Sequence, residues 1–172
     1  SSDYVKLATH TVSSAVSSVS IDGNGSWADN TLYGGYKFYM RNISTSNDSG
    51  SSVVRFRVNF SGTAHSGANY YSVAKQGSST SSSSSIGASY DWGSSQFSLS
   101  YNNMDSEEAR SGYGIVELLN TGGDENGGSG SYWIHIMSDF YSHHSNSSSI
   151  YNMNQMGHLA NNAPISGITL IP

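Results

Sequence analysis

Two segments of the sequence alternate apolar and polar residues with the two-residue period of a half-buried β-strand. Residues 36–41 read Tyr-Lys-Phe-Tyr-Met-Arg, and residues 54–61 read Val-Arg-Phe-Arg-Val-Asn-Phe-Ser. The second segment keeps the alternation over eight residues and places Arg55 and Arg57 together on its outward face. Both segments are therefore predicted strands with one apolar face.

Shorter apolar runs predict further strands between segments rich in Ser, Gly and Asn. One such segment, Gly77–Ser85, is predicted to be a turn-rich spacer. Ile115–Leu119 is almost continuously apolar, which is typical of a strand covered on both faces or lying at an oligomer contact. This number of short strands without helices between them predicts an all-β fold, an antiparallel β-sandwich of jelly-roll type, with 1–172 as a single domain. The further predicted strands are Val5–Ala8, Val16–Ile21, Tyr70–Lys75, Gln96–Tyr101, Gly114–Leu119, Tyr132–Ser138 and Gly167–Ile171.

The composition narrows the class of protein. Serine, glycine and asparagine contribute 39, 19 and 15 of the 172 residues, and only 11 % are charged, against about 25 % in typical domains. Helical bundles and coiled coils need more Ala, Leu, Glu and Lys. A net charge of -5 without a basic cluster argues against nucleic-acid binding. The aromatic content argues against disorder.

Several kinds of site are excluded or disfavoured by residue type. The chain has no cysteine, so it has neither a disulfide framework nor a thiolate zinc site. No apolar run approaches the roughly 20 residues of a membrane-spanning helix, and we expect no membrane insertion. No Gly-x-Ser-x-Gly elbow stands between a strand and a helix. Residues 22–25, Asp-Gly-Asn-Gly, resemble a calcium loop without its later Glu, and a plain turn is the simpler interpretation.

Among the carboxylates, Glu117 stands out because it interrupts an apolar strand. It could be an acid in a cleft, as glycoside hydrolysis requires of a pair of carboxylates. The simpler interpretation is an exposed residue or an ion pair with Arg55 or Arg57.

Histidine offers one possible metal site. His135, Asp139 and His143 recur at a spacing of four, with His144 adjacent, and would share one face of a helix. The surrounding sequence predicts a strand instead, in which His135 to Asp139 spans about 13 Å. We therefore expect no metal, no cofactor and no catalytic residue, and not an enzyme.

The aromatic residues Trp27, Tyr33, Tyr90 and Trp92 lie in or beside predicted Gly/Ser loops. Such rings can cover the apolar face of a sugar while neighbouring amides bind its hydroxyls. These four are the candidate glycan-binding residues. The alternative is that the rings fold back over the edge of the sandwich or fill a subunit contact.

The order of several segments resembles a β-sandwich domain of tailed-bacteriophage particles. The opening residues 4–14 are followed by a strand and an Asp-containing turn, then by Tyr-Lys-Phe-Tyr-Met-Arg-Asn-Ile at 36–43. Further similar segments are Ser-Gly-Thr at 61–63, Asn-Tyr-Tyr at 69–71 and Ile-Ser-Gly-Ile-Thr-Leu-Ile-Pro at 165–172. Relatives usually continue with one more strand, so we expect an incomplete sequence.

The resemblance implies an exposed, non-enzymatic structural protein of the virion, either part of a tail fibre or spike or a capsid decoration. It implies synthesis in the host cytoplasm, contacts with other virion proteins, and assembly with sister subunits as a homotrimer. Together with the loop aromatics it suggests binding of host surface polysaccharide. The alternative is a cellular carbohydrate-binding module or lectin-like adhesin.

Overall fold

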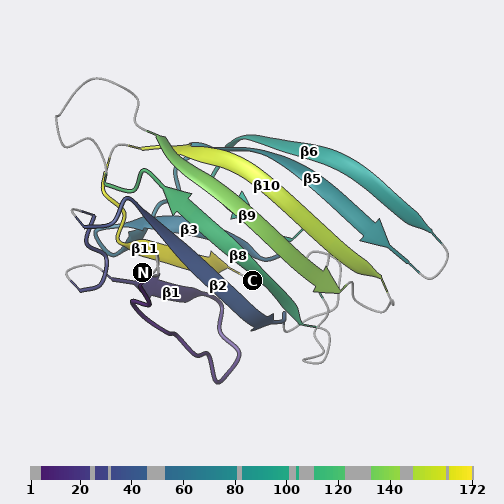
Figure 1. Cartoon of the computed structure of the whole chain (residues 1–172), viewed down its shortest axis with the longest axis horizontal. Helices are drawn as coiled ribbons and strands as arrows, with labels where there is room; N and C mark the ends of the chain where they lie inside the picture. Colours follow the sequence, from purple (N-terminus) through teal and green to yellow (C-terminus); the bar gives the residue numbers. More distant parts are fainter. Residues whose placement is uncertain are drawn as a thin grey trace.

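The strands pair into two antiparallel sheets (Figure 1). The computed structural model describes residues 5–23, 26–30, 32–45, 53–80, 83–100, 104, 111–122, 133–143, 149–161 and 163–171. The larger sheet has the strand order β2-β8-β9-β10-β5-β6, and the smaller one the order β1-β11-β3-β4, with β7 also paired to β3. Every pairing is antiparallel, which confirms the predicted all-β sandwich. Jelly-roll connectivity stays a prediction.

The strand bounds are as follows. The larger sheet contains β2 (Gly35–Ile43), β8 (Gly112–Leu119), β9 (Trp133–His143), β10 (Ile150–Ala160), β5 (Tyr70–Ser79) and β6 (Ser84–Ser94). The smaller sheet contains β1 (Val19–Asp22), β11 (Gly167–Ile171), β3 (Arg55–Phe60), β4 (Thr63–Ala64) and β7 (Phe97–Ser98).

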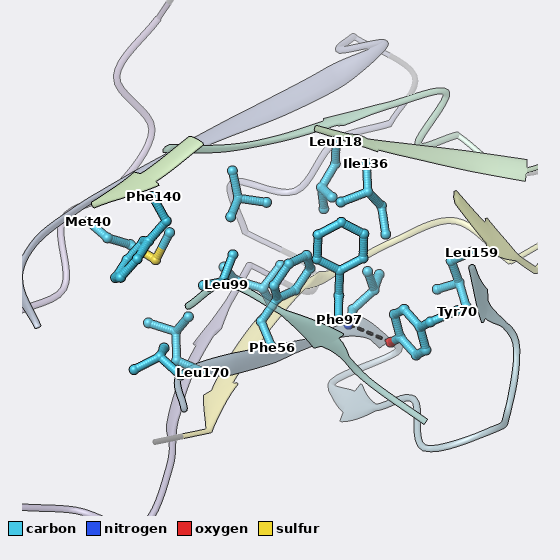
Figure 2. Close-up of a cluster of buried hydrophobic side chains, with 14 of the residues drawn as sticks. Met40, Phe56, Tyr70, Phe97, Leu99, Leu118, Ile136, Phe140, Leu159 and Leu170 are labelled. Atoms are coloured by element: carbon cyan, nitrogen blue, oxygen red, sulfur yellow. Dashed lines mark hydrogen bonds between the residues drawn. The ribbon is translucent and has the colours of Figure 1, made fainter. Parts of the chain in front are cut away.

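The hydrophobic core lies between the two sheets (Figure 2). Phe56 of β3 and Phe97 of β7 place their ring centroids 5.1 Å apart in its centre. Leu118 and Ile136 reach the core from the larger sheet, and both are fully buried. The alternation that predicted β3 is thus the alternation between this core and the outer surface of the smaller sheet.

A tyrosine joins the sheets by hydrogen bonds as well as by packing. The hydroxyl of Tyr70, on β5, accepts a 2.8 Å hydrogen bond from the backbone N–H of Val58, on β3 (Figure 2). The same hydroxyl donates to the carbonyl of His65 at 3.2 Å. Burial of the ring raises the pKa of Tyr70, so the hydroxyl keeps its proton and both bonds.

Glycines on β10 and β8 let the aromatic core approach the larger sheet closely. A Cβ on Gly157 would meet the Phe97 ring at 2.9 Å and would also collide with the carbonyl oxygen of Tyr71. A Cβ on Gly114 would lie 2.6 Å from the Phe140 ring. Each ring occupies the space that a larger residue would need.

A network of polar side chains lies on the outer surface of the smaller sheet. Its centre is Asn59, which is fully buried. Its amide donates to the Asp22 carboxylate at 2.9 Å, and its carbonyl oxygen accepts from the Thr169 hydroxyl at 2.8 Å. Ser166 also donates to Asp22, at 2.9 Å. Asp22 therefore fixes the end of β1 to its neighbours, whereas Asn24 and Gly25 of the predicted turn lie outside the described residues.

Most predicted strands are present, but their first or last residues often differ from the prediction. Gly167–Ile171 is confirmed as β11 with both its limits, and β8 begins two residues before its predicted start. The predicted strand Val16–Ile21 corresponds to β1, which begins three residues later and ends one residue later. Within Gln96–Tyr101 the structure has the two-residue strand β7, and Tyr101 lies outside the described residues. The strand β9 continues beyond its predicted end to His143.

Two expectations about these segments are wrong, and one strand near the middle of the larger sheet is missing from the prediction. Residues 5–8 form no strand, and Val5 is 66 % exposed because the segment pairs with no described strand. The predicted spacer Gly77–Ser85 instead contains the last residues of β5 and the first residues of β6, and residues 81–82 lie outside the described ranges. The strand β10, which was not predicted, lies near the middle of the larger sheet.

Candidate functional site

The larger sheet has one face that no described element covers. Side chains on this outer face alternate with core residues along each strand, and many are large, apolar and exposed. The strand registers bring them into rows that cross the sheet. The outer face consists of Lys37, Tyr39, Tyr71, Val73, Lys75, Ile86, Ala88, Tyr90, Trp92, Tyr113, Ile115, Glu117, Leu119, Trp133, His135, Met137, Asp139, Tyr141, Asn152, Asn154, Met156 and His158.

Four of these side chains form an aromatic row, which we define as Trp133, His158, Tyr71 and Trp92. The rings of Trp133 and His158 are stacked with centroids 4.2 Å apart and 6° between their planes. His158 stacks in turn on Tyr71 at 4.9 Å and 26°. The row ends where Tyr71 meets Trp92 edge to face, at 5.1 Å and 80°. It crosses the neighbouring strands β9, β10, β5 and β6, a span of about 14 Å at the usual strand spacing.

The rings of the aromatic row differ in what they offer to a ligand. Trp133, His158 and Tyr71 are stacked on one another, so the ring faces between them are covered and their edges point outward. Trp92 stands nearly perpendicular to Tyr71 and is 84 % exposed, so its indole faces remain open. Tyr90, two residues earlier on the same face of β6, is 81 % exposed. Trp92 and Tyr90 thus present the accessible ring faces, and the two residues lie about 7 Å apart along the strand.

Apolar and polar groups flank these two rings. Val73 lies opposite Tyr90 in the strand register, and Met156 lies opposite Val73 on the next strand. The following row brings Lys75 and Asn154 opposite each other. The surface therefore combines apolar contact area with an ammonium and an amide that can bond hydroxyl groups.

The environment of His158 disfavours the charged form of its imidazole. Partial burial between Trp133 and Tyr71 lowers the pKa of His158, and the nearby His135 lowers it further. His135 lies directly opposite His158 in the register of β9 and β10.

The structure separates the four glycan-binding candidates into two pairs. Tyr90 and Trp92 lie on the outer face, although within the strand β6 and not in a loop as expected. Trp27 and Tyr33 pack instead against the core. The Trp27 ring meets the rings of Tyr36 and Phe38 edge to face at 5.7 and 6.3 Å, and Tyr33 meets Tyr36 at 6.2 Å.

Sequence reasoning missed the other members of the aromatic row. Trp133 was assigned to a strand, but nothing in the sequence pairs it with His158 or Tyr71. Their contact depends on the registers of β9 with β10 and of β10 with β5. For Tyr71 and Trp133 the available signal was an aromatic residue within a predicted strand, whereas His158 lies on β10, which was not predicted.

The acidic residues that were considered as catalytic or metal-binding groups form contacts with side chains of neighbouring strands. Glu117 forms an ion pair with Lys37 on the adjacent strand at 3.0 Å, so the expected pairing with Arg55 or Arg57 on the other sheet is wrong. Asp139 accepts a 2.9 Å hydrogen bond from the amide of Asn152. Within the described ranges no three His, Cys, Asp or Glu residues come together as metal ligands, and His144 lies outside those ranges.

Comparisons with known proteins add no family to this description. No family model, no curated protein and no solved structure matches the chain. The resemblance to tailed-phage particle domains therefore stays a prediction. In the part of the chain that the structure describes, no helix is long and apolar enough to cross a bilayer.

Proposed function

We propose that this protein is a non-enzymatic binding module whose ligand is a carbohydrate and whose binding surface is the outer face of the larger sheet. The observation that carries the proposal is the aromatic row ending in Trp92, with Tyr90 beside it, on a face that no described element covers. Exposed apolar surface of this kind marks binding sites in soluble proteins.

Carbohydrate fits this surface better than a compact apolar ligand. The outer face is an open sheet surface, whereas drug-sized apolar ligands are bound in concave pockets. Trp92 and Tyr90 offer two exposed rings about 7 Å apart along one strand, and this arrangement suits successive sugar units of an extended polysaccharide. Lys75 and Asn154 supply hydrogen bonds to hydroxyl groups next to that apolar area.

The setting that we propose is the surface of a tailed-phage particle, as a fibre, spike or capsid decoration. The resemblance of the sequence and its low charge support this setting, in which the outer face would meet host surface polysaccharide. A cellular carbohydrate-binding module would use the same surface in another place. Detection of the chain by mass spectrometry in purified phage particles tests the setting separately from the binding.

The binding proposal is tested on an array of bacterial and plant polysaccharides. We expect binding to at least one polysaccharide, weakened at least about tenfold by Trp92→Ala and by Tyr90→Ala. Tyr39→Ala is the matched control, because Tyr39 is 68 % exposed on the same face but on the opposite edge strand, and it should bind normally.

Two results would contradict the proposal. The first is the absence of binding to any polysaccharide, or binding that Trp92→Ala and Tyr90→Ala both leave unchanged. The second comes from incubating the bound polysaccharide with the protein and counting reducing ends. Cleavage that a single carboxylate substitution abolishes would show an enzyme.

A further inference from the structure

The two edges of the larger sheet differ in how they are protected. The edge strand β2 carries Lys37 and Arg41 and has a register shift between Met40 and Ile43, with Asn42 at a φ of 56°. Charges and irregular backbone at an edge prevent pairing with another strand. The opposite edge strand, β6, has neither Lys nor Arg nor Pro. Its register with β5 is regular from Ser84 to Trp92, and shifts only beyond Trp92.

The first half of β6 is also exposed on both of its faces. Every residue from Ser84 to Ala88 is exposed, and Ile86 is 77 % exposed. Among the described strands this segment pairs only with β5, and its exposure shows that the smaller sheet does not cover it. The segment is the outermost strand of this part of the sheet, and its edge presents backbone N–H and C=O groups with which an added strand could pair.

We propose that β6 pairs antiparallel with β6 of a second copy of this chain, about a two-fold axis perpendicular to the sheet. The regular stretch Ser84–Trp92 is centred on Ala88, and full overlap of two such stretches places Ala88 opposite Ala88. Ile86 of each copy then lies opposite Tyr90 of the other, an aromatic and β-branched pair that stabilises antiparallel sheets.

Charge and symmetry agree with a second copy as the partner. The only charged residue of β6 is Asp91, and in this register it lies opposite Ser85. The two Asp91 carboxylates are then about 20 Å apart, so they do not repel each other strongly. The two-fold axis leaves both outer faces on the same side, and the six-stranded sheets continue into one another. This pairing does not depend on carbohydrate binding.

The test is the mass of the protein in solution at micromolar concentration, by light scattering and sedimentation equilibrium. We expect an even number of 18.3 kDa chains for the natural sequence. Ala88→Lys brings two like charges together across the axis, beside Lys75, which lies opposite Ala88 on β5, and should halve the mass and raise the dissociation constant at least about tenfold. Ala88→Glu also brings two like charges together across the axis, but each carboxylate lies opposite Lys75 of its own chain, so we expect a smaller rise in the dissociation constant. An equimolar mixture of the two variants should restore the mass, because Lys then faces Glu.

The control variant is Tyr39→Lys, which adds the same charge to the protected edge strand β2 and should leave the mass unchanged. Circular dichroism confirms that each variant is folded. A monomer or a trimer of the natural sequence would overturn the proposal, as would an unchanged mass in both Ala88 variants or failure of their mixture to reassociate. Polysaccharide binding by the natural protein, whatever its mass, distinguishes failure of this pairing from failure of the proposed function.

Discussion

The indole of Trp133 and the imidazole of His158 lie almost parallel, with centroids 4.2 Å apart and 6° between their planes. The two residues are diagonal neighbours, since Trp133 pairs with Ala160 and His158 pairs with His135. Large side chains reach across such diagonal positions. The stack therefore depends on the register of β9 and β10, and it begins the aromatic row that continues to Trp92.

The position of His158 makes the stability of the protein depend on pH. Its pKa is lowered in the folded state by burial and by His135, so the unfolded chain binds the proton more tightly. The free energy of unfolding should therefore fall as the pH drops below about 6.5 and level off below the folded-state pKa. Urea denaturation at pH 7.5 and pH 5 measures this loss.

The variant His158→Gln removes the titrating group and keeps a neutral side chain at this position. It should lose less stability between the two pH values than the natural protein does. Some pH dependence should remain, because burial and Arg57 lower the pKa of His65 in the same direction. An equal loss in the variant and the natural protein would show that His158 does not contribute.

Removal of the Tyr70 hydroxyl should destabilise the sandwich. Tyr70→Phe leaves the buried N–H of Val58 without its 2.8 Å partner and also removes the bond to the His65 carbonyl. We expect a loss of about 1–3 kcal/mol in the free energy of unfolding, measured by urea denaturation. The control Tyr39→Phe concerns an exposed ring and should change stability by less than about 0.5 kcal/mol. Equal effects of the two substitutions would contradict the role of Tyr70.

Gly157 should not tolerate a side chain. Gly157→Ala forces its Cβ against the Tyr71 carbonyl oxygen and the Phe97 ring, and we expect a loss of about 1–3 kcal/mol. Gly77 on β5 is the matched control, because a Cβ there would have no heavy atom within 4 Å. Gly77→Ala should leave the thermal midpoint unchanged or raise it slightly. A fall as large as that of Gly157→Ala would contradict the packing explanation.

The sequence was sufficient to predict the strands that have one apolar face. Val54 to Phe60 and Tyr36 to Met40 alternate because one side of each strand meets the core, and that alternation is visible without a structure. The strand β10 shows no such alternation. Met153, Gln155 and Gly157 face inward, and Asn154 and Met156 face outward, so neither of its faces is uniformly apolar or polar.

The strand β6 was missed for a related reason. Its first half is exposed on both faces, so small and polar residues such as Ser84 and Ser85 are compatible with a strand that has no core side.

The candidate site could likewise not be predicted in full, because the sequence does not show which aromatic residues are exposed. Trp27 and Trp92 both lie beside Gly and Ser in the sequence, but Trp27 is partly buried in contact with Tyr36 and Phe38, while Trp92 stays exposed.

The most direct test of the proposed binding surface uses the three tryptophans of the chain. Their indole N–H groups give separate signals in a ¹⁵N–¹H spectrum, assigned by substituting each tryptophan in turn. Trp92 and Trp133 lie on the outer face, and Trp27 packs against the core. Titration with a polysaccharide that the protein binds should shift the Trp92 and Trp133 signals and leave that of Trp27 in place. A shift of the Trp27 signal with those of Trp92 and Trp133 unmoved would contradict carbohydrate binding at the outer face.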